Sequence, residues 1–420
     1  MRTTRSVILL AAVALVSTLV IAPASADDAR SGGGPGAVTL DQVQARGTHN
    51  SFKLDPQWPG RELAGWDYQH KRLSRQFEEQ DVRQVELDVH YNWARGEFEV
   101  YHAWLGDDRT NCRKLVDCLE EIRWWSDLRP HHHPIMILVE PKDGGPPRNE
   151  ALPEDGDPFT HPIGEAEYRE LDRILLEAFD GSVAEGGRVL TPDDLTAPGA
   201  SLRDSVLAHG WPAIDDLRGH VIYNIDGRCS VEERPEASEH AYDYSRGWTS
   251  LESRAAFVPA EPFHDVAGFV CRSGQTKPGE GKYDRIRRLV EQGFLVRDLV
   301  GPSGFEDAKA AGVHFISNDH PEELELSDHP HAPSRCNPVT APRRCQDQWL
   351  ERRASDDIDL PDEPSDATED VLADQIDRLV VRSAESAATF GQRSAEDPDV
   401  ATSTAERQAE VWRDFLTRWL

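Results

Sequence analysis

Acidic and polar side chains gather in three short segments within the first third of the chain. His49 and Asn50 lie in a short polar cluster of "ARGTHNSF", at the end of the first expected strand. Glu86 and Asp88 alternate within the apolar segment "VELDVH", and Glu140 ends the apolar run "IMILVE". A charge buried in an apolar strand without a partner is costly. We therefore expect these acids to share a counter-charge.

The chemistry of this set points to a hard cation and a phosphate. The expected ligands supply one amide oxygen and three carboxylates, which suit calcium and suit magnesium less well: Asn50, Glu86, Asp88 and Glu140. Hard cations prefer oxygen, so His49 and His102 are free to transfer protons or to stabilise charge on a phosphate. With Lys142 nearby in "VEPKD", the set predicts one Ca²⁺ and a phosphodiester-cleaving site.

The elements that must position these residues resemble the strands of a barrel. Eight short apolar segments have strand-like composition: 45–49, 82–89, 98–102, 135–140, 220–226, 255–259, 294–298 and 312–317. Amphipathic stretches, such as 115–127 and 166–179, lie between several of them. Eight strands in about 280 residues fit an α/β fold of the (β/α)₈ TIM-barrel type. A doubly wound open sheet is the alternative, which periodicity alone does not exclude.

In a barrel the C-terminal ends of the strands meet at one mouth, where active sites lie. The first four expected strands would bring the acids, both histidines and Lys142 to that mouth. The run His131-His132-His133 precedes a strand and falls at the opposite end. We therefore interpret it as part of a loop, and not as a metal site.

The first 26 residues have the parts of a secretory signal peptide: an arginine-containing start, an apolar core and the cleavage pattern Ala24-Ser25-Ala26. A transmembrane anchor fits less well, because the apolar core is short. A secreted, extracellular protein can oxidise its six cysteines. Proximity suggests the pairs Cys112–Cys118, Cys229–Cys271 and Cys336–Cys345, one of 15 connectivities.

The charge excludes one class of partner. The formal net charge is −30, or −32 once the two arginines of the leader are removed. Such a chain should not bind nucleic acid. The excess of acids serves solubility or attracts divalent cations. Composition divides the mature chain into a flexible Gly-rich segment at 27–42, a catalytic domain at 43–347, and an acidic linker with C-terminal helices at 348–420.

Several motifs across 43–347 carry a resemblance: "GTHNSF", "QVELDVHYNW", "EVYHAW", "PIMILVEPKDG", "VHFISNDHP" and "RCNPVTAPRRC". Together they resemble the calcium-dependent phosphoinositide-specific phospholipases C, and the secreted bacterial branch most closely. The resemblance implies a distorted barrel and a calcium ion held by the four oxygen ligands. It also implies that His49 stabilises the phosphate and that His102 protonates the diacylglycerol oxygen. Glu86 or Glu140 would accept the proton of the inositol 2-hydroxyl, which gives a cyclic inositol phosphate that water can open.

On this hypothesis, the substrate is phosphatidylinositol or a related phosphodiester. Lys142, Asn224, Asp226 and Arg297 are the expected headgroup contacts, and so few bases suit a headgroup without extra phosphates. We expect a monomer that touches a membrane surface transiently, with Trp93 in a polar connection as the contact residue. A glycerophosphodiester phosphodiesterase and a non-catalytic calcium- or lipid-binding barrel are the alternatives.

Overall fold

The structure is a computed structural model that describes residues 37–56, 65–92, 95–103, 106–142, 163–226, 254–260, 262–269, 281–326, 333–341 and 357–363. Its strands are β1 (Val43–Thr48), β2 (Val82–Asn92), β3 (Glu97–Val100), β4 (Ile135–Pro141), β5 (Val221–Ile225), β6 (Ala256–Phe257), β7 (Arg297–Leu299), β8 (Phe315–Asn318) and β9 (Ser334–Cys336). The helices are α1 (Leu73–Glu79), α2 (Leu115–Leu128), α3 (Glu165–Ala178), α4 (Pro192–Leu195), α5 (Leu202–His209), α7 (Lys282–Glu291) and α8 (Phe305–Ala311). The sequence-based helices at 115–127 and 166–179 are thus confirmed as α2 and α3.

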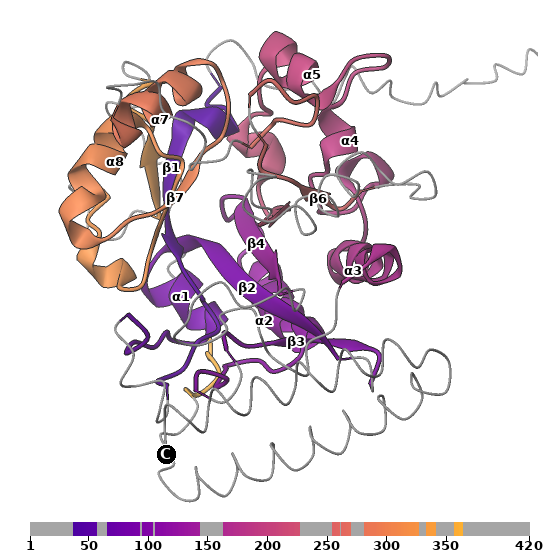
Figure 1. The fold of residues 1–420 in the computed structure, drawn as a ribbon, viewed down its shortest axis with the longest axis vertical. Coiled ribbons are helices and arrows are strands. Elements are labelled where there is room, and N and C mark those ends of the chain that lie inside the picture. Colours follow the sequence, from indigo (N-terminus) through magenta and orange to yellow (C-terminus); the bar gives the residue numbers. More distant parts are fainter. Residues whose placement is uncertain are drawn as a thin grey trace, which may run out of the picture.

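One curled sheet organises the molecule (Figure 1). Its strands lie in the order β6-β5-β4-β2-β1-β8-β7, and every neighbouring pair in that order is parallel. The segment around Phe269 connects the two ends. Leu295 donates its N–H to the carbonyl of Gly268 at 3.2 Å, and Ala260 donates to Phe269 at 3.0 Å. The α/β, distorted TIM-barrel fold expected from the sequence is confirmed.

One expected barrel strand was wrong. The segment predicted at 98–102 forms β3, which runs antiparallel to β2 and lies off the main path of the sheet. Only four residues separate β2 from β3, and a parallel connection needs a dozen or more. The hairpin carries the chain out from the mouth along β2 and returns it along β3. His102 therefore reaches the mouth from this hairpin instead of from a barrel strand.

Side chains on the barrel strands alternate between two environments, as the pleat of a strand requires. The outward residues pack with α1, α2 and α3 in one apolar cluster: Val85, Leu87, Val89, Ile137, Val139 and Tyr223. The inward residues of β4 and β5 are apolar in the lower layers, where Met136, Leu138 and Ile222 belong to a second cluster. Asp88 and Glu140 pair in register above Leu138, so the acids lie at the C-terminal end of an apolar interior.

Other parts of the chain support the barrel from outside. β9, which was not predicted, pairs antiparallel with β1, and Ser334 Oγ lies 2.5 Å from His133 Nδ1. His132 likewise bonds Ser126, so two of the three consecutive histidines are buried in structural contacts. In the segment 357–363, two side chains pack against the outer apolar cluster, Ile358 and Leu360.

The remaining expectations are tested only in part. The Cys112–Cys118 disulfide is present, and Cys336 is disulfide-bonded to a partner outside the described residues. The leader, residues 27–36, Trp93, the predicted Cys229–Cys271 pair and most of 348–420 also lie outside them. Within the described part of the chain, no helix is both long and apolar enough to cross a bilayer.

Candidate active site

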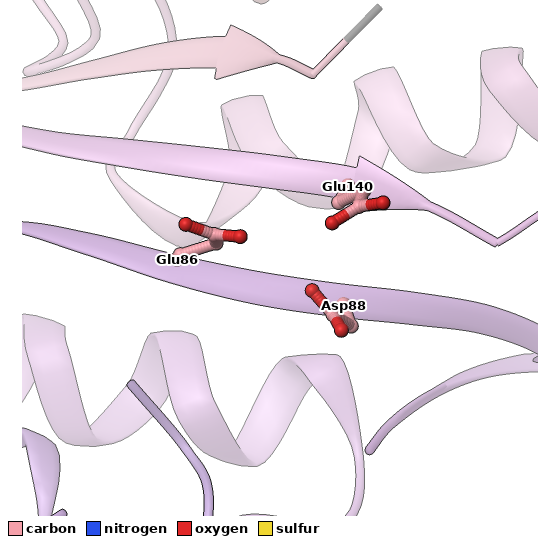
Figure 2. Close-up of side chains that lie close together, drawn as sticks. All are labelled: Glu86, Asp88 and Glu140. Carbon is pink, nitrogen blue, oxygen red and sulfur yellow. The ribbon is translucent and has the colours of Figure 1, made fainter. Parts of the chain in front are cut away.

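Three carboxylates from two neighbouring strands converge at the barrel mouth (Figure 2). Glu86, Asp88 and Glu140 each offer an oxygen, and these atoms all lie within 4.8 Å of one another. The two acids of β2 point the same way because they are two residues apart, and register places Glu140 directly opposite Asp88. Asp88 is fully buried, and Glu140 is 20% exposed. No second group of this kind, made of acids, histidines or cysteines, occurs among the described residues.

Two basic side chains balance this cluster incompletely. Lys142 Nζ lies 2.8 Å from Glu140 Oε1 and 3.2 Å from Asp88 Oδ2. Arg297, on β7, pairs with Glu86 and also donates to Ser317 Oγ at 2.9 Å. Three negative groups therefore face two positive ones, and all five side chains are buried or half-buried. The site retains a net negative charge that a divalent cation would reverse.

The pKa values of Asp88 on β2 and Glu140 on β4 are shifted in opposite directions. Burial raises the pKa of Asp88 well above its usual value, and the charges of Glu140 and Glu86 raise it further against the opposing effect of Lys142. Burial would also raise the pKa of Glu140. The charge and hydrogen bond of Lys142, helped by His49 and His102, instead lower it to about 2. Without a metal, Asp88 is thus the acid that most needs another positive charge.

Asn50 has the features of a fourth ligand. It follows β1 with a φ of 48°, in the left-handed region that asparagine tolerates better than most residues. Its Nδ2 donates to the Tyr68 hydroxyl at 3.0 Å, while its buried Oδ1 has no hydrogen-bond donor. Ser51 fixes the turn to β2, because its N–H donates to the Glu86 carbonyl and its Oγ accepts from the Glu86 N–H. A buried amide oxygen without a donor, one residue from the Ser51–Glu86 contact, fits a calcium ligand.

His49 is held from several sides at the end of β1. Its Nδ1 lies 2.8 Å from Asp319 Oδ1 and 3.1 Å from the Tyr68 hydroxyl. Its Nε2 lies 3.8 Å from Glu86 Oε1, and its carbonyl contacts His70 Nε2 at 2.8 Å. The hydrogen bond to Asp319 places a proton on Nδ1, so Nε2 faces the carboxylate cluster.

His102 forms a second histidine–aspartate pair. Its Nδ1 lies 2.7 Å from Asp107 Oδ2, and its ring meets the Trp66 ring edge-on at 4.9 Å between centroids. Asp107 is completely buried and also contacts Lys53 Nζ at 2.8 Å. The charge of His102 acts on Glu140, as that of His49 does, so both imidazoles lie near the acids.

The expected headgroup residues are only partly gathered at the site. Lys142 and Arg297 are bound to the acids, as described above. Asn224, on β5, pairs in register with Leu138, and its buried Oδ1 has no hydrogen-bond donor. Asp226 continues β5 through a backbone hydrogen bond to Val139 at 2.7 Å.

Four residues of the site were not predicted from the sequence. Asp319, Asp107, Tyr68 and Lys53 orient the two histidines, yet none was singled out. A signal existed for Asp319 and Asp107. Asp319 ends the run "HFISND", and Asp107 follows His102 by five residues. Tyr68 and Lys53 lie in a long connection after β1, where no periodic pattern marks them.

More than half of the chain matches one protein family. The family model described as "Phosphoinositide phospholipase C, Ca2+-dependent" matches residues 38–105 and 93–329. The chain belongs to this family. It is therefore a phospholipase C-type enzyme, in the class of phosphoric diester hydrolases, and the family implies a calcium ion for which the acid cluster is the candidate site.

Solved phospholipases C are similar at low identity. The calcium-dependent enzyme of a Pseudomonas species is 17% identical, with a TM-score of 0.46, and the match covers 72% of this chain and 96% of that one. The Ca²⁺-dependent enzyme of Streptomyces antibioticus is 18% identical, with a TM-score of 0.45 and coverages of 69% and 98%. The phosphatidylinositol-specific enzyme of Listeria monocytogenes is 14% identical, with a TM-score of 0.30 and coverages of 68% and 90%. No curated protein matches the chain.

Proposed function

We propose that this phospholipase C is secreted and cleaves phosphatidylinositol, or a closely related phosphodiester, to diacylglycerol and a cyclic inositol phosphate. One observation carries the proposal. Two histidines, each paired with its own aspartate, lie beside a single cluster of three carboxylates and an orphaned amide oxygen. Displacement at a phosphodiester needs charge stabilisation on the phosphate and a proton for the leaving oxygen. The arrangement offers a separate imidazole for each task.

The proposed calcium ligands are Asn50, Glu86, Asp88 and Glu140. Calcium held there would stabilise negative charge on the phosphate and lower the pKa of the inositol 2-hydroxyl. Glu86 or Glu140 would accept the proton of that hydroxyl. Glu86 is bound by Arg297, and Glu140 is bound by Lys142, so each carboxylate is held in place by a base.

The two histidines would divide the remaining work. The proton on His49 Nδ1 is directed to Asp319, so a protonated Nε2 can donate to a phosphate oxygen. His102 Nδ1 is directed to Asp107, so Nε2 is the nitrogen that would protonate the diacylglycerol oxygen as it leaves. Each aspartate fixes a tautomer and stabilises the imidazolium form.

An inositol ring without extra phosphates suits the described part of the mouth. Lys142 and Arg297 are already engaged with carboxylates, so neither is a spare cation for an added phosphate. Asn224 Oδ1 can accept a hydrogen bond from a ring hydroxyl, because it has no donor of its own. Asp226 would be a further acceptor at the end of the same strand.

Secretion and membrane contact complete the proposal. The Cys112–Cys118 disulfide supports export, since disulfides persist in oxidising compartments. The leader at 1–26 would direct that export, and Trp93 would contact the lipid surface transiently while the enzyme works as a monomer.

A substrate panel tests this function. Purified protein is given vesicles of phosphatidylinositol, vesicles of phosphatidylcholine, and soluble glycerophosphoinositol, each with Ca²⁺ and with chelator. Phosphorus NMR identifies the products. We expect cyclic inositol phosphate from phosphatidylinositol only with Ca²⁺. Turnover of glycerophosphoinositol alone would instead identify a glycerophosphodiester phosphodiesterase, and turnover of none of the three would contradict the proposed substrate.

A further inference from the structure

A fully buried lysine lies behind the proposed general acid. Lys53 has no exposed side-chain surface, and its ammonium is surrounded by oxygens. Its Nζ donates to the carbonyls of Trp66 at 2.7 Å and Tyr68 at 2.9 Å, and it lies 4.6 Å from the centre of the Tyr68 ring. A charge in this position is expensive unless it is paired. Its only charged contact among the described side chains is Asp107.

Asp107 is shared between two positive groups. One oxygen, Oδ1, lies 2.8 Å from Lys53 Nζ, and the other, Oδ2, lies 2.7 Å from His102 Nδ1. The carboxylate is completely buried, so water does not screen these interactions. An aspartate that faced His102 alone would hold the imidazolium proton tightly. Because Lys53 occupies the other oxygen, part of that stabilisation is cancelled.

We propose that Lys53 sets the proton affinity of His102 through the carboxylate of Asp107 that both residues share. A general acid works best when it holds its proton near the working pH and releases it readily. Lys53 would therefore keep His102 from becoming too weak an acid. The role of His102 as the general acid rests on the proposed function. The effect of Lys53 on the proton affinity of His102 does not depend on that function.

Few other charged groups of the described residues lie near Lys53, Asp107 and His102. Beyond Asp107, Lys53 is influenced by Asp319 and Asp67 at longer range. His102 interacts electrostatically with Glu140, and the Trp66 ring against it is uncharged. Removing Lys53 leaves all of these acids in place. The change in His102 then reports the loss of one positive charge behind Asp107.

The test follows the imidazole of His102 by proton–carbon NMR in the full-length protein at saturating Ca²⁺, with the signal assigned by its loss in His102→Gln. We expect Lys53→Met to raise the pKa of His102 by about one unit and Asp107→Asn to lower it. Lys71→Met is the matched control. It removes one positive charge from the same connection, but Lys71 is 45% exposed and pairs with Glu79.

A double variant separates charge from structure. Lys53→Met together with Asp107→Asn removes both buried charges, so it tests the proposal even if Lys53→Met alone does not fold. The proposal predicts nearly the same His102 pKa as in Asp107→Asn, because burial lowers the pKa of Lys53 and the loss of Asp107 favours its neutral form. It is overturned if the two variants differ markedly, or if Lys53→Met leaves the His102 pKa unchanged or lowers it. These shifts without any phosphodiesterase activity would contradict the proposed function alone.

Discussion

His49 and Asp319 are 270 positions apart in the chain, yet His49 Nδ1 lies 2.8 Å from Asp319 Oδ1. The parallel pairing of β1 with β8 creates this contact, because Thr48 and Asn318 are register partners at the ends of the two strands. Burial would raise the pKa of Asp319, but the hydrogen bond and charge of His49 lower it overall. The first histidine of the site is therefore oriented by the last strand of the barrel.

Asp319→Asn should lower kcat by roughly 10²-fold or more, because the amide can stabilise the wrong tautomer of His49. The calcium affinity should stay close to that of the wild type, since Asp319 is not among the proposed ligands. Steady-state kinetics and isothermal titration calorimetry measure the two quantities. A variant with normal kcat would show that the contact is merely structural.

His102→Ala should lower the rate on phosphatidylinositol by roughly 10²–10⁴-fold. A substrate with a nitrophenol leaving group needs little protonation, so it should recover much of that loss. His49→Ala should not recover in this way, because its proposed partner is the phosphate. Equal recovery of both variants would argue against this division between the histidines.

Asp88→Asn should have opposite effects with and without calcium. The pKa of buried Asp88 is raised in the fold, so its charge destabilises the metal-free protein above the ordinary aspartate range. The stability of the metal-free wild type should therefore fall as the pH rises through that raised pKa. The affinity for calcium should increase over the same pH range. The variant should melt higher than wild type in chelator and lose most of the stabilisation by Ca²⁺. Differential scanning calorimetry across pH measures both, and a variant with wild-type calcium stabilisation would exclude Asp88 as a ligand.

Lys142→Met should lower the stability of the metal-free protein and increase its affinity for calcium. Lys142 lies against two proposed ligands, so its ammonium opposes an incoming cation. Removing it should lower the melting temperature in chelator and lower the calcium Kd by about tenfold. Lys142→Arg is the control that retains the charge. Weaker calcium binding in Lys142→Met would show that Lys142 organises the ligands instead of competing with the ion.

Trp93→Ala should reduce turnover on phosphatidylinositol vesicles and leave turnover of a soluble inositol phosphodiester nearly unchanged, if Trp93 contacts the lipid interface. Trp124→Ala is the matched control, since Trp124 is an exposed tryptophan on α2. Equal loss on both substrates would assign Trp93 a structural role. Unchanged vesicle activity would exclude it as the membrane contact.

The acids and the barrel could be predicted because their signals are local. Glu86 and Asp88 interrupt an apolar strand at alternate positions, and that period alone places them on one face. β3 was mistaken for a barrel strand because a hairpin strand and a barrel strand have the same composition. Only the short connection after Asn92 distinguishes them. Periodicity reports the type of an element, but the pairing depends on the length of the connection.

The supporting residues were harder to predict because their partners are distant or lie in irregular backbone. Asp319 contacts a histidine that lies 270 positions earlier in the sequence. Lys53 lies in a connection without regular structure, where a lysine is normally exposed. Its burial depends on two carbonyls and a carboxylate that only the folded loop brings together.

The central claim is that the cluster of Glu86, Asp88 and Glu140 binds calcium and that this ion is required for phosphodiester cleavage. The most direct measurement is the rate of cyclic inositol phosphate release from phosphatidylinositol vesicles, first in chelator and then across a Ca²⁺ titration, for wild type and Asp88→Asn. We predict no release by wild type in chelator, saturable recovery with Ca²⁺, and a midpoint for Asp88→Asn at much higher Ca²⁺. Full activity of wild type in excess chelator would contradict the account.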